Sequence, residues 1–465
     1  MAAGLPTEKS TASFWHSEPS QFLLGHRTTP ELPTEADVVI VGSGITGASA
    51  ARFLSEDDRA KGLKNGGHCQ PLLYMSSPDI AAFEIRNWET VRSYIEDNNV
   101  PCEWRTTNGC MSFWNEQLAE WALQEVQSLK AHAPELADRV SIVTDQEQMR
   151  RNHRVNGAPL ATITLNTASL WPYKLITFIL QKAIEAGRLN LQTHTPVTKL
   201  EAFSLFHGSA RYRLSTPRGS IATQHVILAT NAYTSHLLPE FHDLIVPERG
   251  VMSALLPPKG STRLPNTYGF VGANGADPHR DDYLNQRPYE GVPNPAGHLM
   301  FGGGTAAATL EHTGVTDDSV LDEGSATYLR RELLNLLAMD GETEGLDELK
   351  ATHQWSGILT TTKDTRPWVG SVPGHGMPNG TLCGKAVVEM LLGEMSGAPA
   401  DYVEERLVRT GALPESYLIS EERVDRCKKL QPVKVQVAKE TERYQQWIEK
   451  GGDPAMARGV LSGNS

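Results

Sequence analysis

The sequence predicts an α/β fold with a β-rich insertion, and three observations support this. A chain of 465 residues with 39% apolar content can bury two cores, so we expect two intertwined domains. The run Val38–Val41 is β-branched without alternation, which is typical of a strand buried in a parallel sheet, and glycines follow it directly. Residues 191–226 alternate instead like a meander of strands.

Helical spacing and composition predict the remaining elements. The first 35 residues are rich in Pro, Thr and Ser with scattered aromatics, which indicates an extended arm packed on a domain surface. Internal repeats and long low-complexity tracts are absent from the sequence. We expect helices at 79–98, 116–132, 173–186 and near 322–338, and charged helical sequence at 421–450.

The composition argues against several classes of partner. A net charge of −12 without a Lys/Arg-rich run opposes binding to nucleic acid or to a membrane surface. The sequence has neither a signal-peptide pattern nor the roughly 18 uncharged apolar residues of a membrane span. Its five dispersed cysteines lack a C-x-x-C pair, so we expect no disulfide framework and no metal site. These features favour a cytoplasmic protein.

The strongest local signal is a G-x-G-x-x-G motif formed by Gly42, Gly44 and Gly47, between the buried strand and a helical segment. This is the context of the dinucleotide-binding fingerprint. Gly42 allows the tight turn, Gly44 lets backbone amides approach a pyrophosphate, and Gly47 allows close helix packing. The phosphates would then lie at a helix N-terminus. A glycine turn without a ligand is the alternative interpretation.

Such a unit normally has a second strand that ends in an acidic residue about 20 residues further on, where it binds the ribose. That position falls at Lys64–Gln70, which contains no acid. Glu56, Asp57 and Asp58 come too early, and Arg59–Lys64 has no β-forming run. The sequence therefore predicts that the second strand is missing.

Two further segments fit a site for a flat ligand. Asn65, Gly66, Gly67 and His68 could bring backbone amides against such a ligand, although an ordinary turn explains them equally well. The apolar run from Gln224 to Ala232 is a strand ending in small and polar residues, which by itself also fits simple core.

Together and in this order, these elements resemble the FAD-dependent oxidoreductases of the D-amino-acid-oxidase and glycine-oxidase class. Among them, the chain is most similar to fungal members and to gamma-glutamylputrescine oxidase. The resemblance extends from about residue 11 to residue 430. Further matching segments are 247–250, 282–288, 355–358, 364–370 and 375–379.

The resemblance implies FAD as the cofactor and assigns several contacts to it. The fingerprint glycines would hold the pyrophosphate, the segment after the second strand would lie beside the flavin, and Val197 would meet the adenine. A strand end would also lie near the cofactor, and a His-Gly loop would close over the flavin ring. The implied contacts besides Val197 are Gly42, Gly44, Gly47, Asn65, Gly66, Gly67, His68, Ala229, Thr230, Asn231, His375, Gly376 and Met377.

The resemblance also implies a Rossmann-like FAD-binding domain interleaved with an α+β substrate domain that carries an antiparallel sheet. The arm would cover residues 1–35 and a helical tail residues 421–465. The FAD-binding domain would comprise 36–100, 160–245 and 350–420, and the substrate domain 101–159 and 246–349.

Two departures from the family pattern affect the expected FAD contacts. Only 17 residues separate Gly47 from Asn65, where the family has a helix, a strand ending in Glu and another Gly-rich turn. A strand and a small-residue turn are also missing before His375. Either the chain is a diverged, cofactor-poor relative, or coding sequence was skipped.

For the reaction, the resemblance implies removal of hydride from the carbon of an amine or amino acid, with oxygen as the final acceptor. Tyr283, Arg287 and Trp355 are the candidate substrate residues, because aromatic walls and a cation suit this chemistry. As alternatives to a substrate role, Arg287 could form a surface ion pair, and Tyr283 and Trp355 could be ordinary core residues. No catalytic base is assigned. A catalytically silent homologue and a nicotinamide-dependent dehydrogenase are the rival functions.

Overall fold

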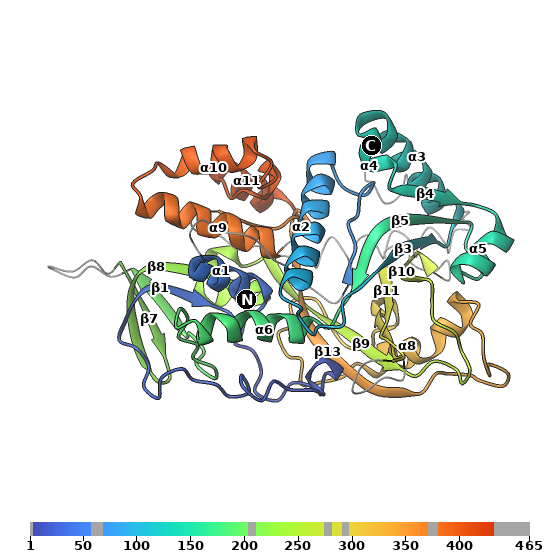
Figure 1. Cartoon of the computed structure of the whole chain (residues 1–465), viewed down its shortest axis with the longest axis horizontal. Coiled ribbons are helices and arrows are strands. Elements are labelled where there is room, and N and C mark those ends of the chain that lie inside the picture. Colours follow the sequence, from blue (N-terminus) through green and yellow to red (C-terminus); the bar gives the residue numbers. More distant parts are fainter. Residues whose placement is uncertain are drawn as a thin grey trace.

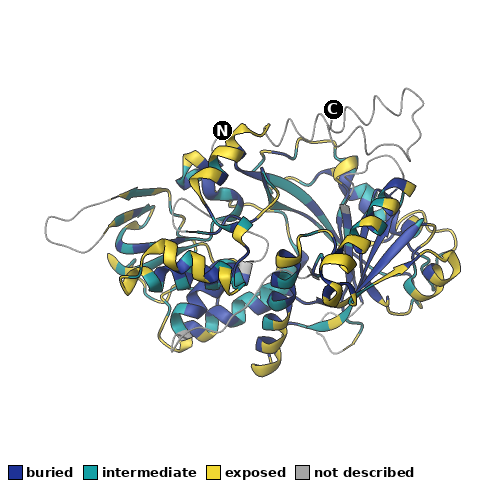
Figure 2. Ribbon diagram, turned by 90° about the horizontal axis from the view of Figure 1, so that it is seen from above, coloured by how far each residue is buried: buried dark blue, intermediate teal, exposed yellow. Residues whose placement is uncertain are grey.

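Two β-sheets organise the protein, at the left and right of Figure 1. The structure is a computed structural model, and it describes residues 3–56, 68–202, 211–273, 281–290, 297–370 and 380–431. Buried strands lie inside, and exposed residues follow the outer faces of the helices (Figure 2). The predicted α/β fold, with a Rossmann-like unit and a second, mainly antiparallel sheet, is confirmed.

The smaller sheet contains the glycine turn. Its order is β1-β8-β7-β6, with β1 and β8 parallel and the other pairs antiparallel. The predicted strand, glycine turn and helix over residues 37–55 are therefore confirmed, and the predicted meander belongs to the same sheet. The strands are β1 (Glu35–Val41), β6 (Lys199–Ala202), β7 (Tyr212–Thr216) and β8 (Gly219–Leu228).

Helices α1 (Ile45–Glu56) and α9 (Gly380–Met395) pack on this sheet, with Phe53 and Val388 against Ile227 of β8. Helix α6 (Pro172–Glu185) lies next to α1. Within the described residues, β1 pairs with β8 alone. Residues 57–67 lie outside the described part of the chain, so the expected loss of a second strand remains a prediction.

The larger sheet has nine strands in the order β13-β9-β12-β11-β10-β3-β5-β2, with β4 also paired to β5. Its pairs are antiparallel except for β10 with β3. The strands are β2 (His68–Cys69), β3 (Arg105–Phe113), β4 (Val140–Val143), β5 (Leu160–Ser169), β9 (Ile245–Leu255), β10 (Asn266–Val271), β11 (Asp281–Gln286), β12 (Leu299–Gly303) and β13 (Ala351–Thr362).

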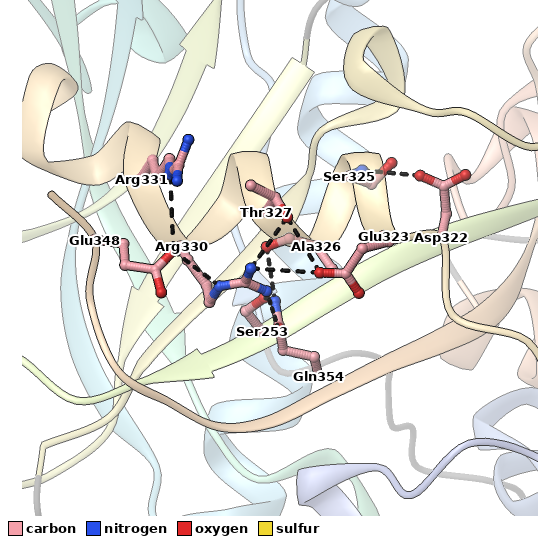
Figure 3. A network of polar contacts seen from close by, with 10 residues as sticks. All are labelled: Ser253, Asp322, Glu323, Ser325, Ala326, Thr327, Arg330, Arg331, Glu348 and Gln354. Carbon is pink, nitrogen blue, oxygen red and sulfur yellow. Dashed lines mark hydrogen bonds and ion pairs between the residues drawn. The ribbon is translucent and has the colours of Figure 1, made fainter.

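Helix α8 (Glu323–Leu336) covers one face of this sheet, where Leu329 packs among Leu284 and Phe301. Figure 3 shows how α8 is anchored to the strands. Arg330 donates to the Gln354 side chain at 2.7 Å, and Gln354 in turn donates to Ser253 at 2.7 Å. One face of β9 and β13 therefore packs against α8. The opposite face of these strands is available for contacts with other parts of the molecule.

The other helices surround the two sheets. Helices α2 (Pro78–Asp97) and α3 (Glu116–His132) cover the β3 end of the large sheet on the face opposite α8, with Met111 and Phe113 in their shared core. None of the described helices is long and apolar enough to span a membrane. These helices are α2 (Pro78–Asp97), α3 (Glu116–His132), α4 (Pro134–Ala137), α5 (Gln146–His153), α7 (Thr234–Leu237), α10 (Ala400–Arg409) and α11 (Glu421–Lys429).

The N-terminal arm crosses both sheets, as the dark blue chain along the bottom of Figure 1 shows. The Thr11 hydroxyl accepts from the amide of Ser356 on β13 at 2.8 Å. Further along, the amide of Thr28 donates to the Leu191 carbonyl oxygen at 2.9 Å. Between them, the short 3₁₀ helix η1 (Phe14–His16) inserts the fully buried Phe14. The arm thus has little regular secondary structure but inserts Phe14 into a buried cluster, and its extent over residues 1–35 remains a prediction.

Several boundaries differ from the predictions. Val197 was expected in a strand, but β6 begins only at Lys199 because Val197 precedes the first pair of the ladder with β7. Helix α11 ends at Lys429, and residues 432–465 lie outside the described chain. β5 and β13 were expected in the FAD-binding domain, but both belong to the larger sheet. The domain boundaries themselves remain a prediction.

Candidate functional site

The glycine turn fits tightly against the end of β8. Gly42 has a φ of 110°, and a Cβ there would lie 2.9 Å from the carbonyl carbon of Ala229. A Cβ on Gly47 would lie 2.9 Å from the carbonyl carbon of Gly42. Both distances are too short for real atoms, so both positions require glycine. This agrees with the structural roles that the fingerprint assigns to them.

Gly44 differs from its two neighbours in the motif. A Cβ on Gly44 would meet no atom of the described residues within 4 Å. Helix α1 begins here, since the amide of Ala48 donates to the Gly44 carbonyl oxygen at 2.8 Å. The open side of Gly44 therefore faces the space at a helix N-terminus, where backbone N–H groups and the helix dipole favour phosphate. The turn fits a dinucleotide pyrophosphate.

The end of β8 connects this turn to the larger sheet. The amide of Ala229 donates to the Val41 carbonyl oxygen at 2.8 Å. Asn231 has a left-handed φ of 47°, and its side-chain oxygen accepts from the Thr360 hydroxyl of β13 at 2.7 Å. The hydroxyls of Thr230 and Thr234 are hydrogen bonded at 2.9 Å. Ala229, Thr230 and Asn231 thus lie where the two sheets meet.

Other predicted cofactor residues are not tested by the structure. Asn65, Gly66 and Gly67 lie outside the described residues, as do His375, Gly376 and Met377. The backbone of His68 begins β2 and pairs with Ser169 of β5 in the larger sheet. Val197 lies in coil ahead of β6. Their cofactor contacts remain predictions.

The face of the large sheet opposite α8 carries two of the three candidate substrate residues, Tyr283 and Trp355, in one row across the strands. Residues directly opposite each other on paired strands point to the same face. Following the register from β13 to β3 gives Trp355, Met252, Gly302, Tyr283, Gly269 and Met111.

Glycines within this row let larger side chains lie flat on the sheet. A Cβ on Gly302 would lie 2.6 Å from the ring carbon Cζ of Tyr283. A Cβ on Gly269 would lie 2.9 Å from the Cε of Met111. Tyr283 and Met252 are half-buried. The middle of the row is therefore an apolar surface of an aromatic ring and a thioether.

Trp355 lies at one end of the row under the N-terminal arm. It is 5% exposed, and its ring centroid is 6.5 Å from that of Trp15. Phe14 and Trp171 belong to the same apolar cluster. Trp355 is thus core beneath the arm, while Tyr283 remains partly accessible.

Arg287, the third candidate, lies in a buried ion pair rather than a surface one. Its guanidinium is 2.8 Å from the Glu103 carboxylate and stands over the rings of Phe14 and Trp171, at 4.9 and 4.5 Å. Glu103 also accepts from Lys174 at 3.0 Å. Because the Arg287 charge is already neutralised, its partners do not support a role as the free cation of a substrate site.

Sequence reasoning missed several residues of this arrangement. Met252 and Met111 are recognised only through long-range strand pairing, and the same holds for the Glu103 partner of Arg287. A usable signal was present at Gly269 and Gly302, because glycine inside an apolar strand often marks a close approach of other groups.

The family model described as FAD dependent oxidoreductase matches residues 37–390, most of the chain. The chain belongs to this family. FAD is therefore its family cofactor, and the turn at Gly42, Gly44 and Gly47 fits the FAD pyrophosphate. No match was found among the curated proteins.

Several solved structures share the fold of this FAD-dependent oxidoreductase. Glycine oxidase from Geobacillus kaustophilus is 17% identical with a TM-score of 0.59, covering 79% of this chain and 96% of its own. L-amino acid deaminase from Proteus myxofaciens, in complex with anthranilate, is 17% identical with a TM-score of 0.54, covering 86% and 96%. Iminodiacetate oxidase from Chelativorans sp. BNC1 is 18% identical with a TM-score of 0.55, covering 78% and 96%.

Proposed function

We propose that this FAD-dependent oxidoreductase oxidises a small amine or amino acid to an imine, with oxygen as the electron acceptor, in the cytoplasm. One observation carries the proposal: the end of β8 contacts the glycine turn through Ala229 and β13 through Asn231. The phosphate-binding turn is therefore fixed relative to the sheet that carries Tyr283. The names of the similar structures, which include amino-acid and iminodiacetate oxidases, agree with this substrate class.

FAD, when bound, supplies the acceptor for the hydride. The part played by this chain is to bind and orient. Backbone amides at Gly44 and the N-terminus of α1 would hold the pyrophosphate. The Tyr283 ring and the Met252 side chain would pack against the substrate and exclude water. An apolar surface of this kind favours the neutral amine over the ammonium ion, and only the neutral amine can lose hydride readily.

The finer assignment of the substrate rests on the sequence resemblance to fungal members of the family and to gamma-glutamylputrescine oxidase. The matching segments 282–288 and 355–358 lie on β11 and β13, which have β9 and β12 between them in the larger sheet. A substrate with a primary or secondary amine on an otherwise extended chain is consistent with the flat, glycine-rich surface between Trp355 and Met111.

A catalytically silent homologue is the second candidate, and the shortened segment after Gly47 favours it. In the described residues, β1 has β8 as its single neighbour. A nucleotide-binding unit would normally place a strand with a ribose-binding acid on the other side of β1. We infer that this form of the protein binds FAD weakly.

Absorbance and peroxide release would test the proposal. The purified protein is measured in the flavin bands before and after incubation with FAD, and peroxide is then followed over a panel of amines and amino acids. Flavin absorbance together with substrate-dependent peroxide supports the oxidase. Protein that stays colourless with added FAD and releases no peroxide supports the silent homologue. Gly44→Val serves as the control that should lose both signals.

A further inference from the structure

Arg105, the first residue of β3, has a guanidinium group without a hydrogen-bond partner among the described residues. Its Nε, Nη1 and Nη2 atoms are all out of contact with solvent, and none has a hydrogen-bond partner in the part of the chain that the structure describes. A guanidinium has five N–H donors, and leaving them buried and unpaired carries a large desolvation cost. Charged groups in this situation are normally paired with an anion.

The charges near Arg105 make its lack of an anionic partner more costly. Glu103, two residues earlier in the sequence, is bound by Arg287 at 2.8 Å and by Lys174 at 3.0 Å. The neighbouring positive charge of Arg263 disfavours a second cation. Burial and then Arg263 lower the pKa of Arg105 to about 10, so the guanidinium still carries its charge at neutral pH.

The two arginines at this end of the sheet therefore differ in one respect. Arg287 has a carboxylate partner in Glu103, and Arg105 has none among the described residues. Ser169, opposite Arg105 on β5, is 5% exposed. The β3–β5 register shifts between Thr107 and Gly109, and Tyr268 of β10 is close enough to interact electrostatically with Arg105.

We propose that Arg105 binds the carboxylate group of a small molecule. The planar guanidinium matches a carboxylate in a bidentate geometry, and one buried positive charge calls for a monoanion rather than a phosphate dianion. The carboxylate belongs either to a separate organic acid or to one end of the amine substrate, and the second source rests on the proposed function.

Carboxylate binding to the full chain tests the proposal directly. Acetate and glutarate are titrated at constant ionic strength by calorimetry and by thermal unfolding, with acetamide as the neutral control. Wild-type protein is expected to bind the carboxylates saturably and to ignore acetamide. Arg105→Gln should weaken carboxylate binding by about tenfold to hundredfold, the range expected for loss of charge-assisted hydrogen bonds. Arg151→Gln, which alters an exposed arginine on α5, should bind like wild type.

Arg105→Met provides a second variant, because methionine fills much of the space without a charge. It should unfold at no lower temperature than wild type in carboxylate-free buffer, and carboxylate should no longer raise that temperature. Equal carboxylate binding by wild type and Arg105→Gln would overturn the proposal, and so would wild-type protein that binds no carboxylate. If neither variant folds, the wild-type comparison of acetate with acetamide decides.

Further measurements separate this proposal from the proposed function and identify the source of the carboxylate. Carboxylate binding by protein that never takes up flavin supports the Arg105 site and contradicts the oxidase. Flavin-dependent amine oxidation without carboxylate binding supports the oxidase and overturns the Arg105 site. Where both hold, competition between glutarate and the amine identifies the carboxylate as part of the substrate. If glutarate and the amine do not compete, the carboxylate belongs to a separate organic acid.

Discussion

The amide of Ala229 donates to the carbonyl oxygen of Val41 at 2.8 Å, which fixes the end of β8 beside the start of the glycine turn. Two residues later, Asn231 accepts from Thr360 of β13 at 2.7 Å. A single strand end thus contacts both sheets. The relative position of the phosphate-binding turn and the substrate sheet is therefore set by short-range contacts rather than by a flexible linker.

The glycines of the turn should respond differently to substitution. Gly44→Val adds a side chain to open space, so the melting temperature should stay close to that of wild type while the side chain obstructs the pyrophosphate. Gly47→Val would overlap the backbone of Gly42 and should lower the stability by several kcal/mol, on the order of other overpacked core sites. Thermal unfolding and the flavin content measured with added FAD would distinguish the two effects.

If Gly44→Val kept flavin at the wild-type occupancy, the motif would be structural and the cofactor assignment wrong. Gly345→Ala is a useful control, because Gly345 also has open space around its Cβ position but lies far along the chain from the fingerprint. Since its φ of 77° disfavours a side chain, a small loss of stability is expected there with no change in flavin binding.

Glu103→Gln should strongly destabilise the protein. The carboxylate is 9% exposed and holds both Arg287 and Lys174, so its loss removes the ion pair of the buried Arg287, while Lys174 keeps its pair with Glu18 at 2.6 Å. Breaking a buried ion pair from one side typically costs about 3–5 kcal/mol. Urea unfolding would measure this. Glu147→Gln, in an exposed pair with Arg151, should leave the urea midpoint unchanged, and an equally small effect of Glu103→Gln would contradict the structural role.

His298 should make stability sensitive to mild acid. Burial, and next the positive charges of Arg287 and His353, lower the pKa of His298 from 6.5 to about 4. The unfolded chain then binds a proton more readily than the folded protein, so stability is complete above about pH 6.5 and decreases as the pH falls toward 4. His298→Phe, facing Phe14 at a 4.9 Å ring distance in wild type, should reduce this dependence.

The experiment compares urea midpoints of wild type and His298→Phe at several pH values between 4 and 7. Carboxylates elsewhere also titrate at the acidic end, which is why the difference between the two proteins is the relevant quantity. Parallel pH profiles would show that His298 is not held neutral in the folded protein.

Local patterns were sufficient to predict much of the fold. The run Val38–Val41, the glycine motif and the helices near 79–98 and 116–132 are encoded by neighbouring residues, since strand character, turns and helical faces depend on short windows. The start of β6 was harder to predict, because strand limits depend on the partner strand. Val197 fails to pair with β7, whereas Lys199 pairs with Ser215.

The substrate side of the site was much less predictable. Trp355 and Tyr283 share a row only because β9 and β12 lie between their strands, and no local pattern encodes that order. Arg287 was chosen as a cation, but its partner Glu103 is 184 residues away in the sequence. The unpaired guanidinium of Arg105 had no sequence signal, since the lack of a partner is a property of the folded environment.

The shortened segment after Gly47 leads to a prediction about cofactor affinity. Helix α1 occupies Ile45–Glu56, and in the described residues β1 has no strand on the side away from β8. Without a second strand the ribose lacks its carboxylate, and one edge of the sheet lacks a neighbour. Loss of the charge-assisted hydrogen bond alone corresponds to about a tenfold to hundredfold loss in FAD affinity.

Inserting about 20 residues between Lys61 and Asn65, with a β-forming run that ends in Glu, should therefore raise flavin occupancy. The matched control is the same insertion ending in Gln, which supplies the strand without the charge and should recover less of the affinity. FAD titrations followed by fluorescence would compare the two insertions with the unmodified chain. Tight, stoichiometric FAD in the unmodified protein would contradict the argument, because it would mean that the ribose is held by other residues and that the short segment between Gly47 and Asn65 is sufficient.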